Sequence, residues 1–334
     1  MSTISKVAER AGVSRTTVSH VLNHADRVSQ PLRERVLAAI EELGYKPNPQ
    51  AQSLRTGRTN IVAILIPDIL NPYFTELVKT LQTEIERSGM DTLVFNTDVP
   101  GGHPELHGRE YLKQLSRKRV DGAIVADFAL HGMLDQIEKI DVPTVFIGSL
   151  HGQSADSVAL DDFGGGYLMG QHLVGAGHRR IAHVTGPRAF KESAARSAGF
   201  DKALADGGIT IDPALRFEGS FLQPSGREAV RWLFEKHGGA LPSAVFFANS
   251  LMAIGALTEF YDRGVKVPGD IAVAAFDIIA QLEYVRPRLT TVGNSPEVLA
   301  RTATKMLLDR LGGKVEPAPR REVIPCVLME YETA

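Results

Sequence analysis

The sequence has a single cysteine, a single tryptophan and few aromatic residues, and its charges nearly balance at a net −2. Because Cys326 has no second cysteine to pair with, a disulfide-stapled secreted scaffold is excluded and a reducing compartment is favoured. No apolar run approaches the roughly 18 residues that a membrane-spanning helix needs. The N-terminus lacks the basic and then apolar layout of a secretory signal. We therefore expect a cytoplasmic, nucleoid-associated protein.

Sequence motifs typical of enzymes are also missing. We find no phosphate-binding Gly-x-x-x-x-Gly-Lys loop, no Gly-x-Gly-x-x-Gly fingerprint and no Gly-x-Ser-x-Gly nucleophile elbow. His103 and His107 are four residues apart, but Pro104 lies between them and the glutamate of zinc proteases is missing. Cys326 lies in an apolar, strand-like run near the end. We predict no catalytic activity, no metal site and no cofactor.

The charge is distributed unevenly along the 334 residues, which are enough for two or three domains. Residues 1–60 contain nine Lys or Arg and five Asp or Glu, a balance of +4, which leaves −6 for residues 61–334. A small basic segment ahead of a larger acidic one favours a polyanion as the partner of the basic segment.

The first 46 residues contain three short helical patterns. Apolar residues recur at helical spacing over 4–11, 15–23 and about 29–43, and Gly12 and Gly44 end the first and third runs. Two helices that are joined by a glycine turn and closed by a third form a helix-turn-helix arrangement. On spacing alone, a generic three-helix bundle fits equally well.

The second helix has two chemically different faces. The apolar face consists of Val18, Val21 and Leu22. The polar face consists of Arg15, Thr16, Ser19, His20 and Asn23. Hydroxyls and amides suit phosphate oxygens, longer donors suit base edges, and this face carries no acid. The polar face therefore favours the helix-turn-helix over the generic bundle.

Residues 47–60 follow the third helix and have no apolar core of their own. Prolines break the third helix, and Leu54 stands among polar and basic residues, with Arg55 beside it. A flexible linker is one interpretation. The other is a hinge helix whose leucine enters the minor groove as a wedge while the arginine holds phosphate.

Two segments, 4-ISKVAERAGVSRTTVSHVLN-23 and 28–59, closely resemble the lactose-repressor (LacI/GalR) family of bacterial transcription regulators. The similarity continues in the order of the family through 64–74, 172–187, 248–257 and 289–292. The resemblance implies that Arg15, Thr16 and His20 contact base edges of double-stranded operator DNA. It further implies positioning contacts, partly to phosphates, from Thr3, Ser14, Thr17, Ser19 and Asn23, and a minor-groove wedge by Leu54 beside Arg55.

Members of this family act in pairs on pseudo-palindromic operators, so the resemblance implies a homodimer with contacts mainly in the body. After the last expected strand, 323–329, too few residues remain for the leucine heptads by which some relatives form tetramers. His20 is a departure, because relatives usually carry arginine there. We expect the operator to differ from the usual half-site at the base pair under His20.

From residue 61 onward, short runs rich in Val, Ile and Leu alternate with amphipathic stretches. Expected strands are 61–66, 92–96, 122–126, 144–147, 180–184, 244–247 and 271–276. Expected helices include 73–88, 165–174, 194–206 and 251–263. Apolar strands that alternate with helices indicate parallel sheets in βαβ units. Residues 61–334 are too many for one such domain, so we expect two similar halves.

The resemblance implies an α/β protein: a helix-turn-helix head on a periplasmic-binding-protein-like body of two doubly wound α/β subdomains. The predicted domains are a DNA-binding domain 1–46, a hinge 47–60 and an effector-binding and dimerisation domain 61–334. Within the last, subdomain one is expected at about 61–160 plus 293–320, and subdomain two at about 161–292 plus 321–334.

Effectors of open α/β sheets bind beyond the carboxyl ends of the strands. A planar polyol or heterocycle needs polar groups around its rim and an apolar face against it. The loops there offer Asn71, Arg196, Asn249 and Asp277 for the rim and Tyr73, Phe74 and Phe221 for the face. Taken alone, each of them is more readily explained as a helix cap, a surface ion pair or a core residue than as an effector contact. The match to family motifs favours effector contact for Arg196, Asn249 and Asp277.

The chain departs from its relatives at four positions near these residues. Ser250 and Ile278 stand where relatives commonly have aspartate, which removes acceptors for sugar hydroxyls. Phe190 and Glu192 stand where the purine-binding branch has a basic residue and a threonine, which argues against a purine base.

We predict a ligand-responsive, sequence-specific DNA-binding repressor that is controlled by a small metabolite, with a sugar or sugar derivative favoured. The alternative is a solute-binding protein without a DNA role, which would share the body but have no use for residues 1–60.

Overall fold

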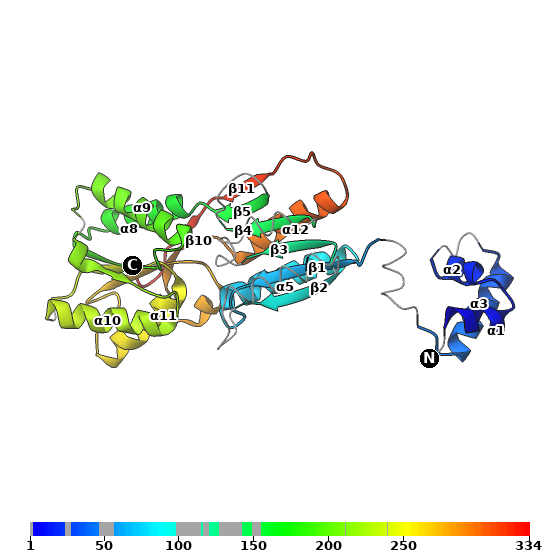
Figure 1. The fold of residues 1–334 in the computed structure, drawn as a ribbon. Coiled ribbons are helices and arrows are strands. Elements are labelled where there is room, and N and C mark those ends of the chain that lie inside the picture. Colours follow the sequence, from blue (N-terminus) through cyan, green and yellow to red (C-terminus); the bar gives the residue numbers. More distant parts are fainter. Residues whose placement is uncertain are drawn as a thin grey trace. The chain divides into compact units, whose positions relative to one another are not determined.

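The computed structural model describes residues 3–23, 28–46, 57–97, 115, 120–126, 142–148, 155–210, 212–238 and 240–334. The expected wedge, Leu54 with Arg55, lies outside the described residues, as does the side chain of Asn23. The chain divides into two compact units, Met1–Thr59 and Asn60–Ala334 (Figure 1).

The first unit contains helices α1 (Ile4–Ala11), α2 (Arg15–Asn23) and α3 (Gln30–Glu42). Gly12 ends α1 at φ 63°, a left-handed conformation that glycine adopts without strain. Val7, Val18 and Val36 are fully buried, one from each helix, so the apolar stripes meet in one small core. An ion pair of 2.8 Å between Arg10 and Glu42 ties α1 to α3.

The second unit contains two six-stranded sheets among its described residues (Figure 1). The first sheet has the order β11-β5-β4-β3-β1-β2 and is parallel throughout. Its strands are β1 (Ile61–Ile66), β2 (Asp91–Asn96), β3 (Gly122–Val125), β4 (Thr144–Ile147), β5 (Asp156–Leu160) and β11 (Arg321–Ile324). Helices α5 (Pro72–Arg87) and α12 (Pro296–Leu311) pack against it. We call this sheet and its helices the first lobe.

The second lobe is built on the order β12-β10-β9-β8-β6-β7, in which only β12 is antiparallel. Its strands are β6 (Ile181–Thr185), β7 (Arg216–Glu218), β8 (Ala244–Phe247), β9 (Ala272–Phe276), β10 (Thr290–Gly293) and β12 (Val327–Met329). Its helices are α8 (Asp162–Gly175), α9 (Lys191–Asp206), α10 (Gln223–His237) and α11 (Ser250–Asp262), with short 3-10 turns η3 (Pro213–Leu215) and η4 (Ala280–Tyr284).

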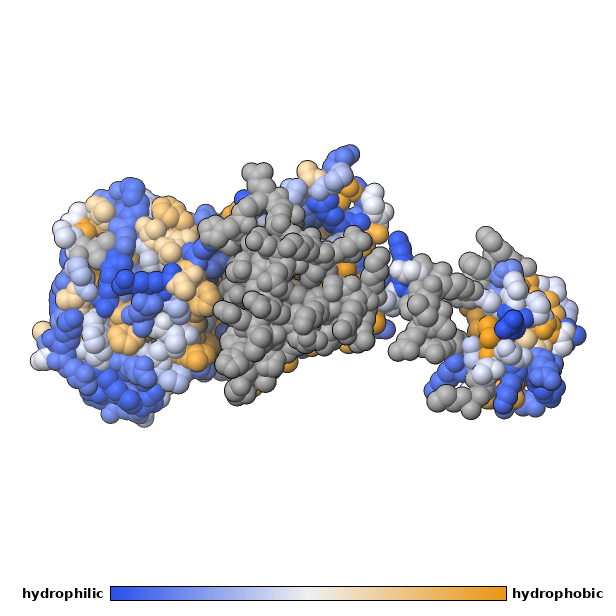
Figure 2. Space-filling view, in the orientation of Figure 1, coloured by the Kyte–Doolittle hydropathy of each residue, from blue (hydrophilic) through white to orange (hydrophobic). Residues whose placement is uncertain are grey.

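Successive residues of the second sheet face opposite layers. His183 and Phe246 pack with Phe200 of α9, whereas Val184 and Phe247 join the core on the side of α10 and α11. Both faces are therefore covered, as the continuous apolar strands predicted. On the face drawn in Figure 2, the described surface of this lobe is mostly hydrophilic with small apolar patches.

The end of the chain differs from the prediction. A single strand at 323–329 in subdomain two was expected, but β11 pairs with β5 in the first lobe and β12 pairs with β10 in the second. Pro325 lies between them and has no N–H to offer to a ladder, so the run breaks there. Residues 321–324 therefore belong to the first lobe, and assigning all of 321–334 to subdomain two was wrong.

Candidate functional sites: a DNA-contacting helix and a buried arginine cluster

The polar face of α2 lies on the surface of the first unit. Arg15, Thr16 and His20 are exposed, while Val18 and Val21 are buried and Leu22 packs partly against the same core. The helix therefore has the two faces that its sequence predicted. Base contacts by Arg15, Thr16 and His20 remain a prediction.

Hydroxyl side chains stabilise the N-terminal ends of α1 and α2 by hydrogen bonding. Ser14 Oγ accepts the backbone N–H of Thr17 at 3.0 Å and lies 2.9 Å from Thr17 Oγ1. Thr3 Oγ1 accepts the N–H of Lys6 at 3.5 Å and caps α1. These caps fix the helix ends, which is where phosphate-positioning groups are needed. Ser19 lies half-buried on the same helix.

In the second unit, Arg196 of α9 is the centre of a buried cluster. Its Nε donates to Asp162 Oδ1 at 2.8 Å, and its Nη1 donates to the carbonyl of Ala248 at 2.7 Å. The same Nη1 lies 3.5 Å from Asp277 Oδ1, and the guanidinium carbon lies 3.8 Å from the centre of the Phe276 ring. Residues from α8 and from the ends of β8 and β9 thus converge on one guanidinium.

The strand ends explain this convergence. β8 leads into Ala248 and β9 leads into Asp277, so parallel strands deliver both to one edge of the sheet. Asp277 has φ 76°, a left-handed conformation that turns the chain sharply after β9. Asp161 caps α8 by accepting the N–H of Gly164 at 2.8 Å, and Asp162 follows it in the first turn.

The charged side chains of this cluster shift one another's pKa values. Burial alone would lower the pKa of Arg196, but Asp162 and Asp277 outweigh it and raise that pKa, so the guanidinium stays charged. Burial raises the pKa of Asp277 to about 6, with Arg196 opposing the rise and Asp162 adding to it. Burial also raises the pKa of Asp162. Two carboxyls therefore share one guanidinium.

Tyr73 is the contribution of the first lobe. Burial raises the pKa of its hydroxyl well above the usual range, and the charge of Asp277 raises it further while Arg196 lowers it. Tyr73 stands in the first turn of α5, two residues after Asn71, whose side chain accepts the N–H of Tyr73 at 3.0 Å. The charges of Arg196 and Asp277 in the second lobe thus act on the hydroxyl of Tyr73 in the first.

The other predicted effector residues have structural partners. Asn71 is the N-cap of α5, and Phe74 is 7% exposed within the core against the first sheet. Asn249 accepts the N–H of Met252 at 3.0 Å as the N-cap of α11. Its Nδ2 donates to the carbonyl of Phe221 at 2.8 Å.

Phe221 is held in an unusual backbone conformation beside this cap, at φ 66°. A Cβ on Gly186 would come within 2.1 Å of its ring, so the glycine after β6 makes room for it. The ring of Phe190 lies 6.0 Å away at 31°. Together the two rings form an aromatic wall at the loops that follow β6 and β7.

Sequence reasoning missed two residues that contact Arg196, namely Asp162 and Phe276, and one buried carboxylate on the same helix, Glu192. Asp162 follows a cap residue, where an acid is ordinary, and Phe276 resembles a core residue of β9. Glu192 was noted only as a departure from relatives. Its position one helical turn before Arg196 was the available signal, because residues four apart share a helix face.

Cys326 borders the same cluster as a half-buried free thiol whose surroundings disfavour the thiolate. Burial raises the pKa of its thiol to about 12, and the charge of Asp162 contributes. The thiol donates to the carbonyl of Asp161 at 3.3 Å. Among the described residues, no group of His, Cys, Asp and Glu could hold a metal ion.

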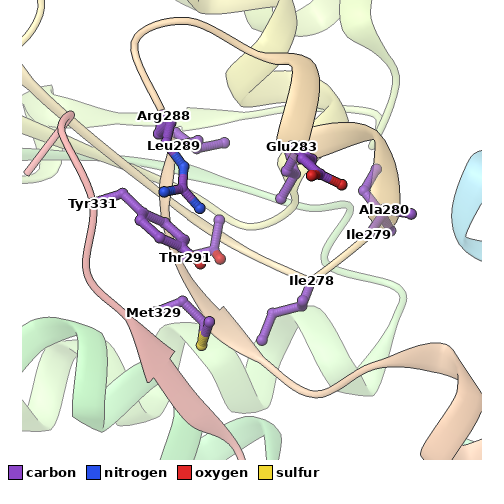
Figure 3. Close-up of a pocket in the computed structure, with 10 residues that line it drawn as sticks. Ile278, Ile279, Ala280, Glu283, Arg288, Leu289, Thr291, Met329 and Tyr331 are labelled. Carbon is purple, nitrogen blue, oxygen red and sulfur yellow. The ribbon is translucent and has the colours of Figure 1, made fainter.

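A cavity of about 250 Å³ lies along the segment that follows Asp277 (Figure 3). Arg288 and Tyr331 form one wall, with the guanidinium carbon 3.9 Å from the ring centre, and Ile279 and Ala280 line the opposite side. None of the predicted effector residues lines it in the described part of the chain. The backbone N–H of Ala280 donates to Glu76 of α5 at 2.8 Å, which links η4 to the first lobe.

Comparison with known proteins assigns the family. The model of the bacterial regulatory proteins of the lacI family matches residues 3–48, and that of the periplasmic binding protein-like domain matches residues 171–333. The chain is 35% identical to the HTH-type transcriptional repressor PurR of Erwinia tasmaniensis, over 100% of this chain and 97% of that protein. This chain belongs to the lacI family of bacterial regulatory proteins.

Solved structures of lacI-family regulators share the fold. The lac repressor dimer bound to operator and the anti-inducer ONPF superimposes with a TM-score of 0.86 at 27% identity, over 99% of this chain and 98% of that chain. The complex of the regulator CelR with cellobiose gives a TM-score of 0.74 at 30% identity, with complete coverage of both chains. The resemblance found in the sequence motifs and the predicted fold class are therefore confirmed.

Membership of the lacI family makes this protein a ligand-responsive, DNA-binding transcriptional repressor. The match over residues 3–48 accounts for the segment that a solute-binding protein would not use. The relative bears the name of a repressor, not of an enzyme. No helix in the described parts of the chain is long and apolar enough to cross a membrane.

Proposed function

We propose that this lacI-family regulator is a repressor whose effector, a sugar or sugar derivative, binds at the cluster of Arg196, Asp277 and Tyr73. The observation that carries the proposal is the buried guanidinium of Arg196, which the second lobe fixes from three sides while Tyr73 approaches it from the first lobe. A polyol ring is bound by hydrogen-bond donors and acceptors at its hydroxyls and by an aromatic face against the ring. The guanidinium, the nearby carboxylates and the aromatic wall offer these groups.

Control of DNA binding follows from the two-lobed origin of the site. A ligand that touches both Tyr73 and Arg196 favours one arrangement of the lobes over another, and such a differential affinity is what allostery requires. Glu76 and Ala280 form a second contact between the lobes, which rearrangement would alter. CelR, which resembles this chain along its whole length, is described in complex with cellobiose, which supports a sugar.

On DNA, the protein acts as a homodimer in which each first unit places α2 in the major groove of a half-site. Arg15, Thr16 and His20 read base edges. Thr3, Ser14, Thr17, Ser19 and Asn23 position the helix, and Leu54 with Arg55 enters the minor groove at the centre. The lac repressor dimer bound to operator supports this arrangement. Because it acts on chromosomal operators, the protein works in the cytoplasm.

The test is a screen of the full-length chain by thermal unfolding and by operator binding. Sugars, polyols, sugar acids, nucleosides and purine bases are added one class at a time. We expect a sugar or sugar derivative to raise the unfolding midpoint and to change operator affinity, and Arg196→Lys to reduce both effects. The proposal fails if no compound shifts unfolding and operator affinity ignores them all, or if only purine bases act.

A further inference from the structure

The cavity beside η4 contains an arginine without a partner of opposite charge. Arg288 is half-buried, and its guanidinium carbon lies 3.9 Å from the centre of the Tyr331 ring. In the described part of the second lobe, it is the one arginine whose guanidinium forms neither an ion pair nor a hydrogen bond. The other arginines there donate to carboxylates or to backbone carbonyls. A guanidinium carries five N–H donors, so this side chain can bind a further acceptor.

The contact with Tyr331 determines which part of the guanidinium is available. A planar guanidinium that lies against an aromatic ring keeps its N–H groups at its edge, and Figure 3 shows Arg288 and Tyr331 together on one side of the cavity. Glu332 accepts the backbone N–H of Arg288 at 2.8 Å and forms no ion pair with the guanidinium. The edge of the guanidinium therefore remains open to a carboxylate, which matches its forked N–H groups.

The rest of the cavity wall is mostly apolar. Its apolar side chains are Ile278, Ile279, Leu282, Leu289 and Met329. Glu283 also lines the cavity, but it is exposed, and Figure 3 shows it on the side opposite Arg288. The volume of about 250 Å³ is below the roughly 300–1,000 Å³ of most ligand pockets, so the ligand is limited to a single ring or a short branched chain.

η4 connects this cavity to the first lobe. Ala280 lines the cavity, and its backbone N–H donates to Glu76 Oε1 of α5 at 2.8 Å. A ligand that packs against Ile279 and Leu282 would favour one position of η4. Because η4 contacts α5, the same ligand would favour one arrangement of the two lobes.

We propose that this cavity is a binding site for a small monocarboxylate with an apolar ring or branched chain, and that its occupation changes operator affinity through η4. Arg288 holds the carboxylate, and the apolar wall covers the rest of the ligand. In the described part of the chain, the cavity shares no lining residue with the cluster of Arg196. The inference therefore goes beyond the proposed effector site and does not depend on it.

The experiment uses the full-length chain and pairs of compounds that differ in charge but have nearly the same shape. The pairs are benzoate and benzamide, phenylacetate and phenylacetamide, and 3-methylbutanoate and 3-methylbutanamide. Acetate serves as the anion without an apolar body. Dissociation constants are measured by calorimetry at neutral pH. We expect at least one carboxylate to bind at least about tenfold more tightly than its amide and than acetate.

Variants of Arg288 test its role in this preference. Arg288→Met keeps an apolar stem and removes the charge, so carboxylate binding should weaken at least about tenfold while amide binding stays unchanged. Arg288→Lys keeps the charge and should retain part of the affinity, and it carries the comparison if Arg288→Met lowers the unfolding midpoint. The matched control is Arg179→Met, which removes an exposed guanidinium outside the cavity lining and should bind as the wild type does.

Operator binding tests the route through η4. A saturating carboxylate should change the operator affinity of the wild type by at least about fivefold, the lower end of typical couplings between sites. Glu76→Ala removes the acceptor of the Ala280 N–H. This variant should bind the carboxylate as tightly as the wild type but show a smaller change in operator affinity.

Three results would overturn the inference. The first is no saturable binding of any carboxylate up to about 10 mM, or amides that bind as tightly as their carboxylates. The second is binding that Arg196→Lys weakens and Arg288→Met does not, because the compound would then occupy the proposed effector site. The third is binding through Arg288 that leaves operator affinity unchanged, which would refute control through η4. Failure of every sugar in the effector screen would instead remove the proposed function and leave this inference standing.

Discussion

His20 is the residue of α2 through which we propose that this protein departs from the usual operator choice of its relatives. It is exposed on α2, on the face that also carries Arg15 and Thr16, while the opposite face is buried. Imidazole is shorter than guanidinium and presents a single ring edge, so it cannot bond O6 and N7 of guanine together as arginine does.

We therefore expect His20→Arg to change the preferred base pair at one position of each half-site and at no other. A good bidentate contact discriminates by about 1–3 kcal/mol, or roughly ten- to hundredfold in affinity at that pair. The measurement is binding to a panel of operators that vary one pair at a time. A uniform change across the panel would show that His20 contacts phosphate.

If the effector binds at the cluster of Arg196 as proposed, Asp277 should make effector binding dependent on pH. Its pKa of about 6 lies above the ordinary value of 3.8, so the folded protein takes up a proton between these values that the unfolded chain does not. The unliganded protein consequently gains stability from this group as pH falls from about 6 towards 4, while the carboxylate acceptor is lost over the same window.

Effector affinity should thus fall as pH drops below about 6, by up to about tenfold per pH unit. Asp277→Asn should bind weakly at pH 7 and show a flatter profile, and asparagine tolerates the left-handed backbone at this position. Effector affinity is measured by binding titrations between pH 5 and 8 on the wild type and on Asp277→Asn. Equal slopes in the two would assign the pH dependence to another group.

At the scale of elements, the sequence was most informative where apolar runs are long. β1, β4 and β8 have the bounds that the sequence predicted, because Val, Ile and Phe are buried from both sides there. β5, β7 and β10 were missed: β5 opens with Asp156, a buried acid, β7 has two half-buried residues and one exposed residue, and β10 begins with two threonines. Tertiary pairing makes these segments strands, and no local pattern predicts that.

The candidate site was predictable to the extent that strand ends and family motifs indicate it. Arg196, Asp277 and Tyr73 were found in this way. Asp162 was not, because its contact with Arg196 comes from the packing of α8 against α9, which brings separate segments of chain around one guanidinium. That packing depends on small residues whose function is visible only in three dimensions.

Gly199 is the clearest example of such a residue. A Cβ at Gly199 of α9 would come within 1.9 Å of the carbonyl oxygen of Phe163, and one at Gly166 of α8 would come within 2.1 Å of the carbonyl of Arg196. The two helices are in backbone contact, and that contact sets where Asp162 meets Arg196.

Gly199→Ala should therefore lower the free energy of unfolding by about 1–3 kcal/mol and weaken effector binding, since the helices must move apart. Gly175→Ala is the matched control at the end of α8, where an added Cβ meets nothing within 4 Å. It should leave stability unchanged or raised by up to about 1 kcal/mol. Chemical denaturation measures both, and equal effects would contradict the close-packing argument.

At the scale of the whole molecule, the chain crosses between the lobes near Asp161, near Asn294 and near Pro325. Asp156 of β5 holds the segment that leads from α12 into β11, just before the last of these crossings. Burial raises the pKa of this carboxyl, but hydrogen bonds from Arg310 and Arg320 outweigh it and bring the pKa to about 2. Arg310 and Arg320 lie 2.7 Å from its two oxygens, so α12 and the approach to β11 are tied to β5.

Asp156→Asn should destabilise the body by about 3 kcal/mol, at the lower end for a broken buried pair because both arginines are partly exposed. In the wild type this contribution is present above the ordinary carboxyl pKa of 3.8 and is lost as pH falls towards 2. Thermal unfolding at pH 7 and at pH 3 tests this, because the difference between the two proteins should shrink at pH 3. A constant difference would mean that packing, not charge, is lost.

The two units must communicate through the segment that contains Leu54, so this residue tests the mechanism of the whole molecule. A leucine that wedges into a base step gains its binding energy only on DNA, when two copies meet at the operator centre. Leu54→Ala should therefore weaken operator binding by about ten- to hundredfold, as expected for losing a contact that offsets a few kcal/mol of unstacking. Thermal unfolding and the effector-induced shift of the body should remain those of the wild type.

Unchanged operator affinity would refute the wedge and make 47–60 a linker, whereas a lowered unfolding midpoint would place Leu54 in the folded core. If affinity falls but the effector still relieves the remaining binding in full, the wedge anchors the protein without transmitting the signal, and the coupling must run through another part of the segment.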